Sequence, residues 1–346
     1  MKIAMITPRY KVDVRGGGER SCKLLVDTLR KQGIDVDVFS GDELFPTEKD
    51  TWKLNIKMYR VVKKLLNDYE VFHTYNMSLL PAVGLLTKKY NINSIASLNG
   101  HVFSPTFATE LSDCPAREHL TNSILLKTLF RYITKFSVLS EFYKETWVKD
   151  GIPQGKIQVI PNMLAEDYKA KDVVHTNTVN ILCVGNYAKW RNLNMLLEAY
   201  SNLPNQNICL SVVGQGWEKE IMNYKGKNTV VYYRKMNHTQ LRDLYALADI
   251  YVQPYQHSGI GRTMLEAAQN KTAIVTTGRL QDFPYLHNFI NYFVNSDMLQ
   301  LTLQTLIKNK DLRDDQGEQI YRIVNKYFSP EVIVKQYIKL YEEILK

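Results

Sequence analysis

The sequence has 346 residues, 45% of them hydrophobic, and a formal net charge of +9. Its length favours two domains of ordinary size, and its apolar fraction is typical of a globular protein with hydrophobic cores. It contains no apolar stretch of about 18 residues, which excludes a membrane-spanning helix. The positive charge suits an anionic partner, namely nucleotide phosphates, an acidic membrane face or nucleic acid, and does not choose among them.

The first residues and the cysteines favour a cytoplasmic protein. The segment MKIAMITPRY has a short apolar run followed by Pro8 and Arg9, which is typical of a buried strand and not of a signal peptide. No CxxC spacing occurs among the four cysteines, which are Cys22, Cys114, Cys183 and Cys209. We therefore expect neither a zinc site nor a disulfide framework, as in a reducing compartment.

Short apolar, β-branched runs alternate with helical patterns along the whole chain. Such runs predict strands that are buried on both faces, as in parallel sheets covered by helices. Their alternation with helices predicts βαβ units and an α/β fold. In chain order, the expected strands are Ile3–Thr7, Val36–Phe39, Val71–Tyr75, Ile92–Leu98, Ser137–Leu139, Ile157–Ile160, Val179–Val184, Cys209–Val213, Val230–Tyr233, Ile250–Gln253, Ala273–Thr276 and Tyr292–Val294.

A polar stretch at residues 166–178, EDYKAKDVVHTNT, has no periodic pattern and separates two series of strands. The predicted domains are therefore residues 1–168 and 169–328, followed by a terminal helix at 329–346. Ser329 suits the N-cap of that helix, and Pro330 suits its first position. In both domains we expect ligands to bind beyond the carboxyl ends of the strands.

Three consecutive glycines, Gly16, Gly17 and Gly18, follow the first expected strand and lead into an amphipathic helix that Gly33 ends. Free N–H groups at such a helix start attract anions, so the loop is a candidate substrate-binding segment. Its pattern, G-x-G-x-x-S, departs from the dinucleotide fingerprint, which disfavours a nicotinamide enzyme. The alternative is a glycine-rich surface turn, although three glycines cost conformational entropy unless a close backbone approach requires them.

A second glycine loop lies in HSGIGRTMLEAAQNKTAIV, residues 257–275. The loop Gly259–Gly261 runs directly into an amphipathic helix that carries one carboxylate, Glu266. The spacing places this carboxylate one or two turns into the helix, on the face that the loop approaches. The alternative for Glu266 is an ordinary solvated helix residue.

A basic amphipathic helix is predicted in DTWKLNIKMYRVVKKLLNDYE, which has five Lys or Arg residues between Lys53 and Lys64. Its apolar residues Trp52, Ile56, Val61 and Leu65 recur roughly one helical face apart. Such a helix can lie on anionic lipid, or it can cover the first domain with a solvated basic face. Residues 119–136 show the same ambiguity. Nucleic acid is disfavoured because no recognition motif accompanies the charges.

Five segments, in this order, resemble motifs of the family 4 glycosyltransferases: GGGERSCKLLVDTLRKQGIDVDVFS, SVLSEFYKETWVKDGIPQGKIQVIPNM, ILCVGNYAKWRNLNMLLEAYSNL, SVVGQGWEKE and LRDLYALADIYVQPYQHSGIGRTMLEAAQNKTAIVTT. The resemblance covers nearly the whole length. It implies the GT-B fold, in which two Rossmann-like domains with parallel sheets face a central cleft. The N-terminal domain is then the acceptor side, the C-terminal domain holds the nucleotide-sugar donor, and the last helix returns to the N-terminal domain.

The resemblance also implies a reaction. Members of the family transfer a sugar from a nucleotide donor to an acceptor hydroxyl with retention at the anomeric carbon, normally without a bound metal. We therefore expect a metal-independent retaining enzyme with no cofactor beyond a nucleotide-diphosphate sugar as co-substrate. Its expected partner is a glycan or lipid-linked acceptor, as in surface glycan, glycolipid or lipid-linked oligosaccharide synthesis, with no nucleic acid. The net charge and the basic helix between Lys53 and Lys64 add an anionic membrane surface as a further expected partner. The expected location is the cytoplasm, including peripheral attachment to the inner face of the cell membrane.

The resemblance assigns substrate-binding residues in the second domain. A leaving diphosphate needs fixed cations; the family's lysine position matches Arg191, the expected catalytic cation, and its arginine position matches the uncharged Asn186. The glutamate that binds the ribose matches Glu266, and the glutamate that contacts the donor sugar falls at Ser258. The other expected contacts are Gly185, Lys189, Gly214, Gly259, Ile260, Gly261, Arg262 and Thr263.

In the first domain, the family's His-Gly pair after the fourth strand matches Asn99 and Gly100, which His101 follows. Asn99 and His101 are therefore expected on the catalytic side, near the donor sugar. His73 and Asn76 end the third strand beside the same cleft. We expect His73 to pack structurally, and Asn76 is a candidate acceptor-side group.

A rival function is that of a non-catalytic nucleotide-sugar-binding protein with a degenerate GT-B site. The departures from the family pattern at Asn99, Asn186 and Ser258 favour it. The sequence identifies neither the donor base and sugar nor the acceptor.

Overall fold

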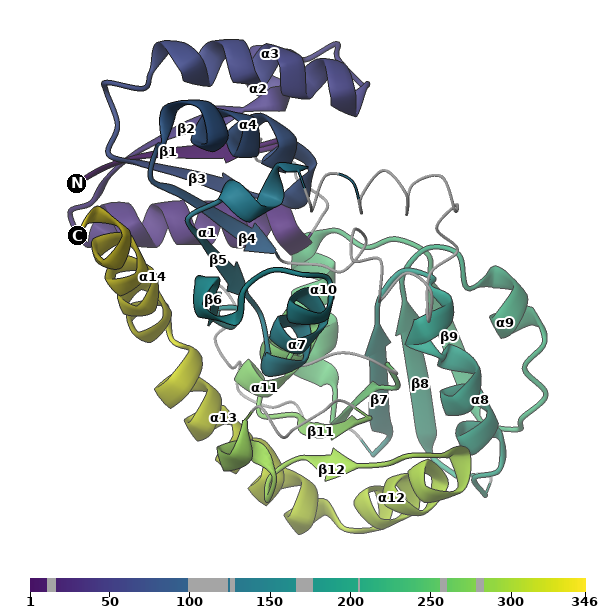
Figure 1. The fold of residues 1–346 in the computed structure, drawn as a ribbon. Coiled ribbons are helices and arrows are strands. Elements are labelled where there is room, and N and C mark those ends of the chain that lie inside the picture. The colour runs from purple at the N-terminus through teal and green to yellow at the C-terminus, as the bar shows by residue number, and fades with distance from the viewer. Residues whose placement is uncertain are drawn as a thin grey trace. The chain divides into compact units, whose positions relative to one another are not determined.

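A computed structural model of the protein describes residues 1–10, 17–98, 124, 128–165, 177–204, 206–255, 260–277 and 283–346. The chain divides into two compact units (Figure 1). The first comprises Met1–Met163 together with Pro330–Lys346, and the second comprises Leu164–Ser329. In the described ranges, none of the helices combines the length and the apolarity that crossing a bilayer requires.

The first unit is built on a parallel six-stranded sheet of order β2-β1-β3-β4-β5-β6. Along β1, Ile3 and Met5 point to one face while Ala4 and Ile6 point to the other, and all four are fully buried. Both faces are therefore covered, as the apolar runs predicted. The strands are β1 (Lys2–Thr7), β2 (Asp35–Ser40), β3 (Val71–Tyr75), β4 (Ser94–Leu98), β5 (Lys135–Val138) and β6 (Ile157–Val159).

Helices cover this sheet on both faces. On the face of Ile3 and Met5 the cover is α1 (Gly17–Lys31) and α14 (Pro330–Leu345). On the opposite face it is α3 (Thr51–Lys64), α4 (Leu80–Tyr90) and α7 (Glu141–Lys149). Short elements connect them, namely α2 (Gly41–Leu44), η1 (Met77–Leu79), η2 (Phe130–Tyr132) and η3 (Gln154–Lys156).

The terminal helix α14 is joined to the sheet by a buried polar chain. The hydroxyl of Tyr341 lies 2.8 Å from Nδ1 of His73, and Nε2 of His73 lies 2.8 Å from Oγ of Ser97. Ser97 in turn bonds Ser137 at 2.7 Å, and Ser137 lies 3.5 Å from the hydroxyl of Tyr337. Complete burial lowers the pKa of His73 to about 3. His73 is thus a structural residue, as predicted.

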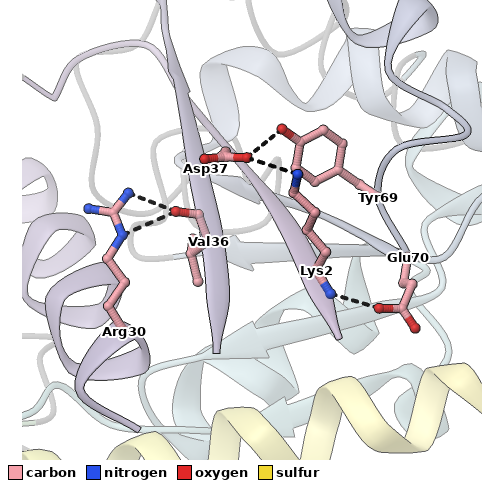
Figure 2. A network of polar contacts seen from close by, with 6 residues as sticks. All are labelled: Lys2, Arg30, Val36, Asp37, Tyr69 and Glu70. Atoms are coloured by element: carbon pink, nitrogen blue, oxygen red, sulfur yellow. Dashed lines mark hydrogen bonds and ion pairs between the residues drawn. The ribbon is translucent and has the colours of Figure 1, made fainter. Parts of the chain in front are cut away.

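A second polar network lies near the amino ends of the strands (Figure 2). The hydroxyl of Tyr69 donates to Oδ2 of Asp37 at 2.6 Å, and Nζ of Lys2 lies 3.5 Å from the same oxygen. The Tyr69 hydrogen bond, and then the charge of Lys2, lower the pKa of Asp37. In the last turn of α1, Arg30 donates from Nε and Nη2 to the carbonyl of Val36 in β2. These contacts stabilise the amino-terminal edge of the sheet, whereas the ligand-binding loops are expected at its carboxyl-terminal edge.

Helix α3 covers the first unit, but the predicted apolar face is not the face that packs. Leu54, Met58 and Val62 are buried against the sheet, whereas Trp52 and Ile56 are 52% and 54% exposed. Both sets recur four residues apart, so helical spacing alone did not distinguish them. In the second basic tract, residues 119–136, the part from Phe130 onward forms η2 and the start of β5, and not a continuous helix.

The second unit has a parallel six-stranded sheet of order β12-β11-β10-β7-β8-β9. All six strands occur where the apolar runs predicted them, although the last is shorter than expected. They are β7 (Val179–Val184), β8 (Ile208–Val213), β9 (Thr229–Tyr233), β10 (Ile250–Gln253), β11 (Ala273–Thr276) and β12 (Asn291–Tyr292).

In the second unit, α8 (Leu193–Ser201) and α12 (Ser296–Lys308) pack on one face of the sheet. Helices α10 (His238–Leu247), α11 (Arg262–Gln269) and α13 (Lys310–Phe328) contact β7, β10 and β11. Gly317 allows α13 to approach closely, because a Cβ there would overlap the carbonyl oxygen of Lys271. The short elements are η4 (Lys189–Arg191), α9 (Glu218–Met222) and η6 (Pro284–Leu286).

Candidate functional site

The strand order of the second unit places a topological switch point between β7 and β10. The chain proceeds from β7 to β8 and β9 on one side of the sheet, and from β10 to β11 and β12 on the other. In open α/β sheets, ligands bind outside the carboxyl ends of the strands at such a point. The loops that leave β7, β8 and β10 therefore form the candidate site of this unit.

Two glycines let the loops after β7 and β8 touch. A Cβ on Gly214 would overlap the carbonyl oxygen of Gly185 and lie 2.8 Å from the backbone nitrogen of Asn186. Gly214 also has a φ of +143°, which disfavours any residue with a side chain. A Cβ on Gly185 would overlap the hydroxyl of Tyr255 and lie 2.5 Å from Nη1 of Arg191. The predicted contacts Gly185, Asn186, Arg191 and Gly214 thus converge at one place.

Arg191 packs against two aromatic rings, whose centroids lie 5.3 Å apart in an edge-to-face arrangement. Its guanidinium carbon lies 5.1 Å from the ring centroid of Trp190 and 5.2 Å from that of Tyr255. Nη1 donates to the carbonyl oxygen of Asn186 at 2.8 Å. The buried Nε has no hydrogen-bond partner among the residues that the structure describes. The guanidinium of Arg191 is therefore fixed at the carboxyl edge of β7, and its Nε–H has no hydrogen-bond acceptor among the described residues.

Asn186 links two loops through its side chain, because its Oδ1 accepts from the backbone N–H of Gln215 at 2.9 Å. The indole of Trp217 strengthens the same contact by donating to the carbonyl of Gly185 at 2.6 Å. Lys189, in the turn before Arg191, is exposed. The geometry thus gives Asn186 a framework role and leaves Arg191 and Lys189 as the cations of this loop.

Helix α11 begins directly after β10 at the switch point. Gly261 is its N-cap, Ile260 is buried, and Oγ1 of Thr263 accepts a hydrogen bond of 2.7 Å from the hydroxyl of Tyr251 in β10. The first N–H groups of an α-helix have no intrahelical acceptor and attract anions. The start of α11 is thus fixed to the sheet with these donors at the carboxyl edge.

Glu266 is buried in the second turn of α11, with 4% of its surface exposed. This excludes the alternative of a solvated helix residue. One carboxylate oxygen lies 3.9 Å from Nη2 of Arg262, whose side chain is also largely buried. Burying a carboxylate is unfavourable unless charges or hydrogen bonds compensate it, and Arg262 supplies a charge.

In the first unit, the switch point lies between β1 and β3, and α1 begins after β1. Gly17 and Gly18 are exposed in its first turn. A Cβ on Gly18 would meet no atom within 4 Å in the described part of the chain. The hydroxyl of Ser21 donates to the carbonyl of Gly17 at 2.9 Å, which ties the helix start to its second turn.

Asn76, the candidate acceptor-side group, has a φ of +96°, and its Oδ1 accepts from the backbone N–H of Ser78 at 3.2 Å. Its side chain therefore caps η1. Five predicted site residues lie outside the described residues: Gly16, Asn99, His101, Ser258 and Gly259.

Sequence reasoning missed three aromatic residues at the site of the second unit, namely Trp190, Tyr251 and Tyr255. Burial raises the pKa of Tyr255, with the charge of Arg191 acting in the opposite direction. The only signal in the sequence was position, because Tyr255 follows an apolar strand and Trp190 precedes the expected cation. Neither position shows that both rings pack against Arg191.

Two family models match adjoining parts of the chain. The model described as Glycosyltransferase Family 4 matches residues 15–168, and the model described as Glycosyl transferases group 1 matches residues 165–322. An uncharacterized glycosyltransferase of Methanocaldococcus jannaschii is 26% identical over 350 residues, which cover 92% of this chain and 86% of that protein.

Solved structures show the same fold. Sucrose-phosphate synthase from Thermosynechococcus elongatus superposes with a TM-score of 0.83 at 16% identity, covering 99% of both chains. HepE of Anabaena, solved in complex with UDP and glucose, superposes with a TM-score of 0.75 at 14% identity and covers 99% of this chain and 100% of its own.

Proposed function

The chain belongs to glycosyltransferase family 4 and has the GT-B fold of two Rossmann-like units, and from this premise we propose that it is a retaining, metal-independent enzyme. It transfers a sugar from a nucleotide-diphosphate sugar to the hydroxyl of a glycan or lipid-linked acceptor. The second unit binds the donor and the first unit presents the acceptor. One observation carries the proposal: an arginine packed against two aromatic rings and a buried glutamate follow the two strands that flank the switch point.

The donor's nucleotide lies at the carboxyl edge of the second sheet. Glu266 accepts hydrogen bonds from the ribose hydroxyls, because it occupies the position of the family's ribose-binding glutamate; its carboxylate lies in the second turn of α11, beside Arg262. The N–H groups at the start of α11 face the sugar and the diphosphate. Gly261 suits this approach, since it presents no side chain at the N-cap.

Arg191 stabilises the leaving diphosphate. Negative charge builds on this group as its bond to the sugar breaks, and a cation that is already fixed needs no rearrangement at that moment. The rings of Trp190 and Tyr255 hold the guanidinium in place, and Nε is a donor without a described protein acceptor. Because Asn186 carries no charge, Arg191 and Lys189 replace the family's pair of cations.

The transfer occurs on one face of the sugar. The departing phosphate oxygen takes the proton of the acceptor hydroxyl while the acceptor oxygen bonds to the anomeric carbon. Holding donor and acceptor together supplies much of the rate gain, so no protein nucleophile is required.

A nucleotide screen tests this function. We expect UDP, GDP or ADP to raise the melting temperature in a saturable way, with UDP as the first candidate because HepE holds UDP. The matching nucleotide sugar should then release its nucleotide when lipid-linked or soluble glycan acceptors are added. Stabilisation without any release across both acceptor classes would favour the rival, a non-catalytic nucleotide-sugar-binding protein. No stabilisation by any of the three nucleotides would contradict both functions.

A further inference from the structure

The outward side of α3 has an unusual composition. Trp52 and Ile56, four residues apart and hence on one side of the helix, are 52% and 54% exposed. The helix lies on the outside of the first unit (Figure 1), with Leu54 and Met58 packed against the sheet. Trp52 and Ile56 therefore add little to the core, and exposed large apolar side chains that are grouped mark interaction sites.

Cations lie beside this apolar pair. At 100° per residue, four basic side chains fall on the same side of the helix, and all four are exposed. Helix α3 contains no acidic residue. We call the exposed set the outer face of α3, and it consists of Trp52, Lys53, Ile56, Arg60, Lys63 and Lys64.

The charges of this face are available to a partner. In the described ranges, Lys53, Arg60 and Lys64 form no ion pair with another residue, although Lys57, at the border of the face, binds Glu48 at 2.7 Å. Asp50, the acid nearest in sequence, is the N-cap and accepts from the backbone N–H of Lys53. The face thus combines an apolar pair with cations, of which Lys53, Arg60 and Lys64 form no ion pair in the described ranges.

We propose that the outer face of α3 binds an anionic lipid bilayer. Trp52 and Ile56 enter the headgroup region, where an indole finds both apolar chains and polar partners. The stems of the lysines and of Arg60 lie along the lipid surface while their charged ends contact anionic headgroups. A bilayer fits the face better than a nucleic acid does, because a base can stack on Trp52 but a nucleic acid has no apolar layer for Ile56.

Binding through the outer face of α3 places the proposed reaction at a membrane surface. If the acceptor is lipid-linked, docking through the first unit brings the enzyme to the plane in which the acceptor's headgroup lies. That consequence rests on the proposed function, whereas the docking itself does not. Both can therefore be tested separately.

The test is sedimentation with vesicles of phosphatidylcholine alone and of phosphatidylcholine mixed with phosphatidylglycerol, at low and at high salt. We expect binding only to the mixed vesicles, with weaker binding at high salt because ions screen the attraction. Arg60→Gln with Lys64→Gln should weaken binding about 25-fold, at about fivefold per cation. The matched control is Lys335→Gln with Lys339→Gln, an exposed pair of the same spacing on α14, which covers the other face of the sheet.

A second pair of variants tests the contribution of the apolar side chains Trp52 and Ile56. Trp52→Ser with Ile56→Ser should weaken binding to the mixed vesicles at both salt concentrations, because it leaves the charges in place. Its control is Met298→Ser with Leu301→Ser, an exposed apolar pair on α12. All of these side chains are exposed, so the variants should keep the wild-type melting temperature.

Several results would overturn the proposal. They are equal binding to neutral and mixed vesicles, no binding to either, or equal losses in the α3 variants and their controls. Capture of the wild-type protein by RNA at the expense of the vesicles would assign the face to nucleic acid instead. Vesicle binding without nucleotide stabilisation would retain this inference and reject the proposed function, and the reverse result would do the opposite.

Discussion

Both units have glycines in the loops that follow their strands, but the surroundings of these glycines differ. In the second unit, Gly185 and Gly214 are required by the protein itself, since a side chain on either would overlap backbone or side-chain atoms of the neighbouring loops. In the first unit, a side chain on Gly18 would meet no described atom within 4 Å. Gly185 and Gly214 thus shape the edge of the candidate site, whereas the described residues leave space beside Gly18 for a ligand to approach the start of α1.

The largest expected effect is on turnover, and it comes from Arg191 at the carboxyl edge of the second sheet. We expect Arg191→Ala to lower turnover by about 100- to 1000-fold, comparable to the loss of one donor to a developing negative charge, and to raise the Michaelis constant for the donor much less. Arg191→Lys, which keeps the charge but not the planar group that packs against the two rings, should recover part of the loss. Release of nucleotide from the selected nucleotide sugar gives both constants. A change confined to the Michaelis constant would assign Arg191 to ground-state binding.

The comparison of the glycines can be tested directly through stability. Gly214→Ala should lower the free energy of unfolding by about 2–4 kcal/mol, because the new Cβ overlaps the carbonyl of Gly185 at a φ that favours glycine. Gly18→Ala, in the first turn of α1, should leave it unchanged or raise it by up to about 1 kcal/mol. Chemical denaturation measures both. Similar losses in the two variants would remove the distinction between a crowded and an open edge.

The buried polar chain under the first sheet predicts a dependence on pH. The pKa of His73 falls to about 3 on folding, from an ordinary value of about 6.5, so below pH 6.5 the unfolded chain binds a proton that the folded one does not. This contribution to stability is present above pH 6.5 and is lost as the pH falls, by about 2 kcal/mol at pH 5. His73→Asn should be less stable at pH 7 and should lack this part of the slope. An unchanged slope in the variant would show that His73 is not its source.

The sequence predicted more of the architecture than of the candidate site. Each of the twelve strands in the described ranges overlaps a predicted run, because strands buried on both faces, such as β1, β3 and β4, read as short apolar runs; the prediction is poorest for the exposed edge strand β12, which shares only Tyr292 with its run. Motif positions predicted Glu266 and Arg191 as site residues. The packing of Arg191 against Tyr255 was not predictable, because the two residues lie 64 positions apart and meet only when β7 and β10 pair.

Helix α3 shows a second limit. Leu54 and Met58 recur at the same spacing as Trp52 and Ile56, so periodicity offers two apolar ridges and does not say which one packs. The sheet buries the first ridge and leaves the second exposed beside the cations. The pattern predicted the basic helix but not the face that the helix leaves exposed.

The most direct test of the whole account is titration calorimetry of the nucleotide selected among UDP, GDP and ADP. Glu266→Ala should weaken binding by roughly 1.5–3 kcal/mol, because it removes charge-assisted hydrogen bonds to the ribose. Glu198→Ala, which removes an exposed helix carboxylate of the same unit, should bind as the wild type does. If Glu266→Ala binds the nucleotide with wild-type affinity, the donor does not lie on α11 and the account of the second unit is wrong.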